Sequence, residues 1–153
     1  MEQEQIQPIK ENLWWVIPGK LAGVRKPMAE EFAQLQEKGI GAIVSVMDDP
    51  SNLDLYQQAN IPYLWLPIEV DGSPSREQMK EFQNFIDSQN QLGHAVAVHC
   101  TSGRHRTGTI LASYLICIGS SYNEAMDVIE KANSQAKLGE AQSAFLQQLA
   151  HKQ

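Results

Sequence analysis

The sequence predicts an α/β domain in which helices flank a central, mainly parallel sheet. Three β-rich runs, 40–47, 61–68 and 95–99, are mostly apolar on both faces, which is typical of strands inside a covered sheet. Helical apolar spacing separates these runs, and strands that alternate with helices form parallel sheets with right-handed crossovers. Ligands bind such sheets at the carboxyl ends of the strands.

The elements of the first third are short. Leu13–Ile17 and Leu21–Val24 flank a Pro-Gly-Lys turn, so we expect two extended pieces there. A helix is expected from Met28 to a stop at Gly39, directly before the strand 40–47. The apolar residues at helical spacing in this segment are Met28, Phe32 and Leu35.

The middle of the chain repeats the strand-and-helix pattern. The strand 61–68 carries prolines near both ends, where no ladder donor is needed. An Asp-Gly turn follows at 71–72, and Ser75 with Gln78 has the spacing of a capping box that opens a helix. The buried stripe of that helix is expected to consist of Met79, Phe82, Phe85 and Ile86.

The last third is expected to be helical after one more strand. The strand 95–99 leads through the loop Cys100–Thr107 into the helix Gly108–Ile118, which is apolar almost all round and therefore central. Two further helices are expected over 121–132 and 139–150. Their inward-facing residues are expected to be Ala125, Ile129, Ala141, Phe145 and Leu149.

Length and composition predict one folded domain. The 153 residues are 42% apolar and 20% charged, which is an ordinary globular balance. We place the domain at 12–150, behind a flexible polar tail at 1–11. The 12 basic and 18 acidic residues give a net charge of −6, which argues against nucleic-acid binding because phosphate backbones are held by basic surfaces.

The sequence also predicts a cytoplasmic protein. Its apolar runs reach about half of the ~20 residues that a membrane span needs, and the N-terminus lacks the pattern of a signal peptide. Two cysteines, Cys100 and Cys117, do not form the disulfide framework of a small secreted domain. We therefore expect reduced thiols, with Cys117 packed as a small apolar residue.

The loop after the strand 95–99 carries the candidate chemistry. Cys100 at the strand's end, five residues and then Arg106 at a helix start give the spacing that wraps a loop around a tetrahedral oxyanion. The backbone N–H groups from Thr101 to Arg106, including those of Ser102, Gly103, Arg104 and His105, are expected to converge on its oxygens. Gly103 permits the tight curvature. The planar fork of Arg106 grips two oxygens, and the same positive field favours a nucleophilic Cys100 thiolate.

This pattern is specific. Three, six, seven and eight residues after Cys100 stand Gly103, Arg106, Thr107 and Gly108. The chance of such a set beside either cysteine is on the order of 10⁻⁴ for average residue frequencies. A metal site is not expected, because the neighbouring His99 and Cys100 face opposite ways and no second Cys or His pair has ligand spacing. We therefore expect no metal and no cofactor.

The segment His99-Cys100, five residues, Arg106-Thr107-Gly108 resembles the signature loop of the cysteine-dependent protein tyrosine phosphatases. The chain resembles their small atypical dual-specificity members over about 12–150. Residues 13–23 resemble the first segment of those phosphatases. Residues 71–75 resemble the loop that supplies their general acid, and residues 140–146 resemble their last helix, which contains a Gln.

Two segments depart from the usual family pattern. The stretch 131–138 lacks the Arg-Pro pair often present before the last helix. The loop 103–108 is closer to the basic loop of plant and fungal atypical phosphatases, whose relatives include inositol pyrophosphate hydrolases. The substrate class is therefore open between phosphoproteins and small phosphoesters.

The resemblance implies that Asp71 is the general acid, which protonates the leaving oxygen and later activates water. Asp48 and Asp49 compete with it, because they follow the strand 40–47 and reach the same sheet edge; the alternative for Asp71 is a plain turn residue. Gln142 is expected to position the attacking water, unless it is only a polar helix residue.

Three other residues near the loop have expected supporting roles. His99 points away from the Cys100 side chain and is expected to orient the loop by hydrogen bonding. Thr107 is expected to hydrogen-bond the sulfur, or else to satisfy the helix start. Arg104 and His105 add positive charge that favours polyanionic substrates, or else form a solvated pair.

The sequence therefore predicts a phosphatase that forms a phosphocysteine. The resemblance favours a dual-specificity protein phosphatase, with an inositol (pyro)phosphate or another small phosphoester as the alternative substrate. A phosphate-binding pseudophosphatase is disfavoured because binding alone needs neither a thiol nor an acid. A rhodanese-like sulfurtransferase is disfavoured because its loop usually has a different cysteine-to-arginine spacing. The expected partners are a phosphorylated substrate and free oxyanions at the loop, and the sequence carries no signal of oligomeric state.

Overall fold

A computed structural model describes residues 8–69, 72–101, 105–136 and 138–151. Its sheet has the strand order β1-β2-β5-β3-β4, in which β1 is antiparallel to β2 and the other pairs are parallel. The predicted mainly parallel sheet is thereby confirmed. The strands are β1 (Trp14–Ile17), β2 (Leu21–Val24), β3 (Ile40–Ser45), β4 (Tyr63–Trp65) and β5 (Ala95–His99).

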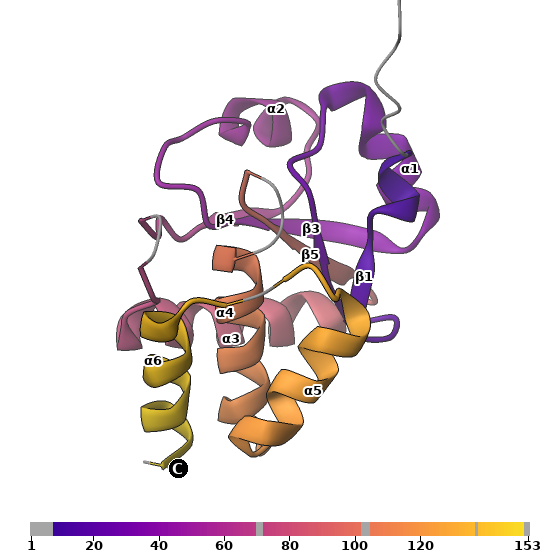
Figure 1. Ribbon diagram of the computed structural model, residues 1–153. Coiled ribbons are helices and arrows are strands. Elements are labelled where there is room, and N and C mark those ends of the chain that lie inside the picture. Colours follow the sequence, from indigo (N-terminus) through magenta and orange to yellow (C-terminus); the bar gives the residue numbers. More distant parts are fainter. Residues whose placement is uncertain (1–7, 70–71, 102–104, 137, 152–153) are drawn as a thin grey trace, which may run out of the picture.

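Helices cover both faces of the sheet, so the domain has three layers (Figure 1). The helices α3, α4, α5 and α6 lie below the sheet in this view, and α1 and α2 lie above it. The helices are η1 (Ile9–Glu11), η2 (Ala29–Glu31), α1 (Phe32–Glu37), α2 (Leu53–Gln58), α3 (Arg76–Gln91), α4 (His105–Cys117), α5 (Tyr122–Ala132) and α6 (Glu140–His151).

The central strand β5 sets the position of the site. All of its residues are buried between β2 and β3. His99, its last residue, pairs with Val24 on one side and with Ser45 on the other. Because three parallel strands end at the same level, the segments that follow them meet at one edge of the sheet.

The helix α4 runs from this edge through the core. Every residue from Arg106 to Ile116 is buried, as its nearly continuous apolar sequence predicts. The predicted starts of its neighbours are also confirmed. Ser75 caps α3 and Ser121 caps α5, each in a reciprocal capping box with the residue three positions later.

Several predicted boundaries are wrong. The strand expected over 61–68 is limited to Tyr63–Trp65, because prolines on both sides interrupt the ladder. The helix expected from Met28 is split into η2 and α1, and Met28 itself is 52% exposed. The helix α4 begins at His105, three residues before the expected Gly108, so its first turn includes Arg106.

Other differences concern segments without a strong pattern. The tail expected over 1–11 contains η1, whose Ile9 is fully buried, so ordered packing begins before residue 12. The helix α2 was not predicted. In α6 Phe145 and Leu149 pack against the core as expected, but Ala141 is exposed and the most deeply buried side chains are Gln142 and Leu146. Among the described residues, no helix is both long and apolar enough to cross a bilayer.

Candidate active site

The candidate nucleophile lies at the carboxyl end of the central strand. Cys100 follows β5 directly and is 3% exposed. Two backbone contacts hold the chain around it: the Val46 N–H donates to the His99 carbonyl at 2.9 Å, and the Lys26 N–H donates to the Thr101 carbonyl at 3.5 Å. The ends of β2 and β3 therefore fix where the loop starts.

Arg106 reaches back from the first turn of α4 toward this edge. Its Nη1 donates to the Ile68 carbonyl at 3.0 Å and lies 3.4 Å from Oδ1 of Asp48, and its Nη2 donates to Oγ1 of Thr101 at 3.4 Å. The Arg106 side chain is 10% exposed. The guanidinium is thus held beside the residue that follows Cys100, where a planar fork can grip two oxygens of a phosphate.

His99 is held on the opposite face by hydrogen bonds at both ring nitrogens. Its Nδ1 lies 3.1 Å from the Cys100 carbonyl and its Nε2 lies 2.7 Å from the Tyr56 hydroxyl. Burial, the main cause, lowers the pKa of His99 to about 4. The ring is therefore neutral near pH 7 and fixes the carbonyl of the candidate nucleophile.

Sequence reasoning missed Tyr56 and Asn52, which complete this network. The Asn52 amide donates to the Tyr56 hydroxyl at 3.1 Å and to the Pro27 carbonyl at 2.7 Å. Asn52 has a left-handed backbone (φ 74°), which asparagine tolerates better than most residues. In the sequence, the signals for this network were Asn52 before a short segment with helical apolar spacing and Tyr56 one turn later. Both signals are too weak to predict a hydrogen bond to His99.

Thr107 lies in the first turn of α4 and is fully buried. Its Oγ1 has no hydrogen-bond partner within the described part of the chain. A buried hydroxyl without a partner costs free energy, so such a group marks strain or function. Thr107 is therefore a candidate for a functional role at the start of α4.

Gln142 lies in the first turn of α6 and is 4% exposed. Its Oε1 would be only 2.7 Å from a Cβ placed on Gly139. A side chain at position 139 would therefore displace the amide end of Gln142 from its present position.

The remaining predicted site residues divide into two groups. His105 opens α4 and is exposed, and Thr101 is exposed at the loop start. Asp71, Ser102, Gly103 and Arg104 lie outside the described residues.

Of the two competing aspartates, only Asp48 contacts Arg106 among the described ion pairs. The carboxylate of Asp49 instead accepts a hydrogen bond from the Ser51 N–H at 2.9 Å. Hydrogen bonds from Ser51 are the main cause of the lowered pKa of Asp49. A lowered pKa keeps this carboxyl ionised, which disfavours Asp49 as the general acid.

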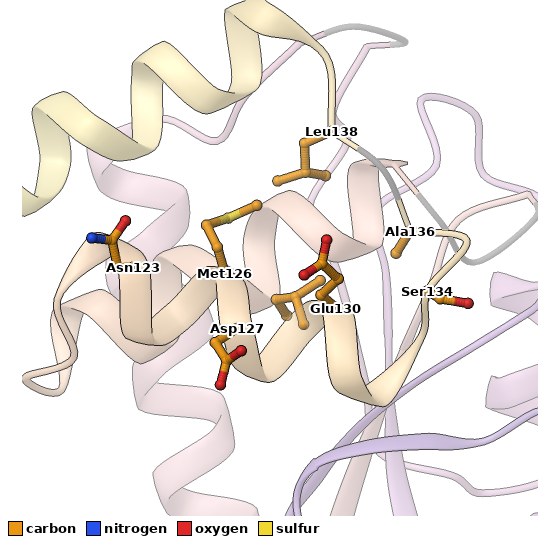
Figure 2. A pocket seen from close by; sticks show the side chains of 8 residues that line it. Asn123, Met126, Asp127, Glu130, Ser134, Ala136 and Leu138 are labelled. Carbon is orange, nitrogen blue, oxygen red and sulfur yellow. The ribbon is translucent and has the colours of Figure 1, made fainter.

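A separate cavity of about 460 Å³ lies between α5 and the segment that leads to α6 (Figure 2). Its apolar wall includes Met126 and Leu138, and its acidic side chains are Asp127 and Glu130. Among the described residues, its lining includes none from the loop after β5. Leu138 of its wall lies close to the first turn of α4, since a Cβ placed on Gly108 would be 3.2 Å from the Leu138 side chain.

Comparisons with known proteins agree with this architecture. The family model described as "Tc-R-P: Polymorphic toxin system, DSP-PTPase phosphatase" matches residues 19–120, which contain β2 to α4 and hence both Cys100 and Arg106. The matched region thus covers about two thirds of the chain.

Two curated relatives share the central region. The tyrosine-protein phosphatase of Autographa californica nuclear polyhedrosis virus is 32% identical over 114 residues, which cover 68% of this chain and 64% of the viral protein. The Rattus norvegicus phosphatidylglycerophosphatase and protein-tyrosine phosphatase 1 is 31% identical over 87 residues, which cover 56% of this chain. The matched region is 45% of the rat protein, so this chain matches about half the length of that relative.

A solved structure extends the similarity to almost the whole fold. The crystal structure of Tk-PTP in the active form superposes with a TM-score of 0.82 at 25% sequence identity, and the match covers 93% of this chain and 98% of that chain. With the family match, this similarity includes the sheet, the helices and the Cys100–Arg106 segment. The chain belongs to the DSP-PTPase family, as a small atypical dual-specificity member of the protein tyrosine phosphatase superfamily.

Proposed function

We propose that this protein hydrolyses phosphomonoesters through a phosphocysteine formed on Cys100. The observation that carries the proposal is the position of Arg106. Its guanidinium reaches from the start of α4 back to Thr101 and to the Ile68 carbonyl, beside the residue that follows the central strand. An arginine fork, a helix N-terminus and a cysteine at one sheet edge form an oxyanion site with a nucleophile at its centre.

The first step transfers the phosphoryl group to sulfur. The Cys100 thiolate attacks phosphorus in line with the leaving oxygen, so that an S–P bond forms while the O–P bond breaks. The loop amides and Arg106 hold the equatorial oxygens as charge shifts among them. Asp71 gives its proton to the departing alkoxide or phenoxide.

The second step releases phosphate. A water molecule positioned by Gln142 attacks phosphorus, Asp71 accepts its proton, and the S–P bond breaks. Thr107 donates its hydroxyl hydrogen to the departing sulfur, which makes the thiolate a better leaving group. Arg106 and the amides supply the positive charge, so the reaction needs no metal.

We assign the acid to Asp71 and keep Asp48 as its rival. Asp48 lies beside Arg106, the residue that this proposal assigns to phosphate. The two assignments differ in one measurable respect. Replacing the true acid slows turnover of substrates with poor leaving groups far more than turnover of a nitrophenyl phosphate, whose leaving group needs little protonation.

The proposed substrates are phosphoproteins that carry phosphotyrosine or phosphoserine/threonine. The family match to a DSP-PTPase supports this class. A small phosphoester, such as an inositol (pyro)phosphate, is the second candidate, supported by Arg104 and His105 in the loop and by the phosphatidylglycerophosphatase relative. A cytoplasmic location fits the mechanism, since a nucleophilic thiol must stay reduced.

The test is phosphate release from p-nitrophenyl phosphate in the presence of EDTA. Wild type is expected to turn over, and Cys100→Ser is expected to bind phosphate while losing at least a thousandfold in rate. Cys117→Ser removes the other thiol and is expected to keep the rate within twofold. A rate that EDTA abolishes, or that survives in Cys100→Ser, would refute the mechanism. A panel of phosphopeptides and inositol phosphates then separates the two substrate classes.

A further inference from the structure

The guanidinium of Arg106 already contacts a carboxylate of this chain. Asp48 Oδ1 lies 3.4 Å from Nη1, the same nitrogen that donates to the Ile68 carbonyl at 3.0 Å. Of the three oxygens that contact Arg106 within the described residues, only that of Asp48 carries a formal charge. Asp48 is thus an internal anion at the arginine that the proposed function assigns to phosphate.

The two sides of this contact differ in exposure. The Arg106 side chain is 10% exposed, whereas that of Asp48 is 49% exposed. The bond to Ile68 is buried, so Asp48 occupies the solvent side of the guanidinium. An anion that arrives from solvent meets the Asp48 carboxylate next to the same N–H groups.

Two anions beside one guanidinium compete. Phosphate near neutral pH carries between one and two negative charges, and it is repelled by a carboxylate a few ångströms away in a half-buried site. Phosphate must also replace the Asp48 contact if it is to use that Nη1 hydrogen. Both effects weaken the binding of phosphate, and the first grows with its charge.

We infer that Asp48 sets the affinity of the site for phosphate by competing for Arg106. This inference rests on the proposed function, because it takes Arg106 to be the phosphate-binding residue. The consequence is faster product release, because free phosphate is held less tightly and leaves the site sooner. Asp48 is then an affinity-determining residue, distinct from the acid on the leaving-group side.

The neighbouring Asp49 provides a matched control. It carries the same charge one residue away and is exposed, but its carboxylate accepts a hydrogen bond from the Ser51 N–H. Asp48→Asn and Asp49→Asn therefore remove the same charge from the same segment. Only the first removes the contact with Arg106.

The experiment measures the dissociation constant of inorganic phosphate by titration calorimetry for wild type and both variants. Asp48→Asn is expected to bind phosphate about fivefold more tightly, the scale of an exposed ion pair. Asp49→Asn is expected to stay within twofold of wild type. Asp48→Ser, which cannot mimic the carboxylate's shape, is expected to tighten binding similarly and covers the case in which the asparagine variant folds poorly.

Other outcomes overturn the inference. Equal tightening in both asparagine variants would mean a general effect of net charge. Weaker binding in Asp48→Asn would mean that Asp48 orients Arg106 for phosphate, and unchanged binding would mean that the contact is without effect. Turnover of p-nitrophenyl phosphate with unchanged affinities refutes this inference alone. Phosphate binding that tightens in Asp48→Asn without any turnover in wild type refutes only the proposed function.

Discussion

The Tyr56 hydroxyl and the His99 ring form a bond whose direction is fixed by their other partners. The Cys100 carbonyl only accepts, so Nδ1 of His99 carries the hydrogen and donates to it at 3.1 Å. A neutral ring then leaves Nε2 as an acceptor, to which Tyr56 donates at 2.7 Å. Asn52 donates to Tyr56 in turn. The chain of bonds therefore runs one way, from α2 to the backbone of the candidate nucleophile.

Tyr56→Phe tests whether this chain of bonds positions the loop. The variant leaves Nε2 of His99 without its donor in a buried place, so we expect the free energy of unfolding to fall by about 1–3 kcal/mol. We expect kcat on an aryl phosphate to fall about tenfold with a smaller change in KM, since the Cys100 carbonyl loses its fixed orientation. Steady-state kinetics and urea unfolding provide both numbers.

Tyr63→Phe is the matched control for this variant. Tyr63 packs against Tyr56 with ring centroids 6.0 Å apart, but it lies on β4, and the described part of the structure shows no hydrogen bond between Tyr63 and His99. The control is expected to keep kcat within twofold. Equal loss of kcat in both variants would mean that removal of a tyrosine hydroxyl from this aromatic cluster disturbs the loop by itself, whether or not that hydroxyl bonds to His99.

The depressed pKa of His99 predicts a loss of stability in acid. Folded His99 stays neutral down to its pKa of about 4, while in the unfolded chain the ring takes up a proton near the usual histidine pKa of 6.5. The unfolded state therefore binds more protons between these values, and its free energy falls relative to the folded state as the pH drops. From pH 7 to pH 5 we expect His99 to account for about 2 kcal/mol of lost stability.

His99→Asn isolates this contribution. Its amide can still donate to the Cys100 carbonyl but does not titrate, so the variant is expected to lose less stability than wild type between pH 7 and pH 5. Urea unfolding of both proteins at the two pH values measures the difference. Parallel loss in wild type and variant would assign the acid sensitivity to other groups.

Local patterns in the sequence predicted those elements whose signals lie within one segment. The bounds of β5 followed from its continuous apolar run, and the cap at Ser75 followed from capping-box spacing. The helix α2 has only six residues, too few for a period to emerge. In α6 the buried face includes the polar Gln142. Apolar spacing alone therefore predicted the neighbouring Ala141 as the inward-facing residue.

The site was predictable in its outline but not in its contacts. Cys100 and Arg106 are six residues apart, and a strand followed by a helix determines their relation. The contact of Arg106 with Asp48 joins residues 58 positions apart, and the bond of Tyr56 to His99 joins residues 43 apart. Such contacts depend on the conformations of separate loops that meet at the sheet edge. The local spacing of apolar residues carries no information about those conformations.

Arg106→Lys tests the need for a planar fork. Lysine keeps the positive charge and can still donate to the Ile68 carbonyl, but one ammonium cannot bind two phosphate oxygens in a plane. We expect kcat/KM for an aryl phosphate to fall at least a hundredfold while the protein remains folded. Arg76→Lys, the same change at an exposed position of α3, is expected to have no effect on kcat/KM. A loss below tenfold in Arg106→Lys would mean that charge alone suffices.

Thr107→Val separates function from stability at the start of α4. Valine matches the shape of threonine and removes a fully buried Oγ1 that has no partner among the described residues, so stability is expected to hold or rise slightly. The rate of phosphocysteine hydrolysis is expected to fall about tenfold, because the departing sulfur loses its donor, and rapid-quench measurements should then detect accumulated phosphoenzyme.

Thr109→Val is the matched change two residues on, and it should behave in the opposite way. The Oγ1 of Thr109 donates to the His105 carbonyl at 2.8 Å and the residue is fully buried. Its loss is expected to lower the free energy of unfolding by about 1 kcal/mol and to leave phosphoenzyme hydrolysis within twofold. If Thr107→Val instead destabilised the protein as Thr109→Val does, without slowing hydrolysis, then the Thr107 hydroxyl would serve the helix start and not the sulfur.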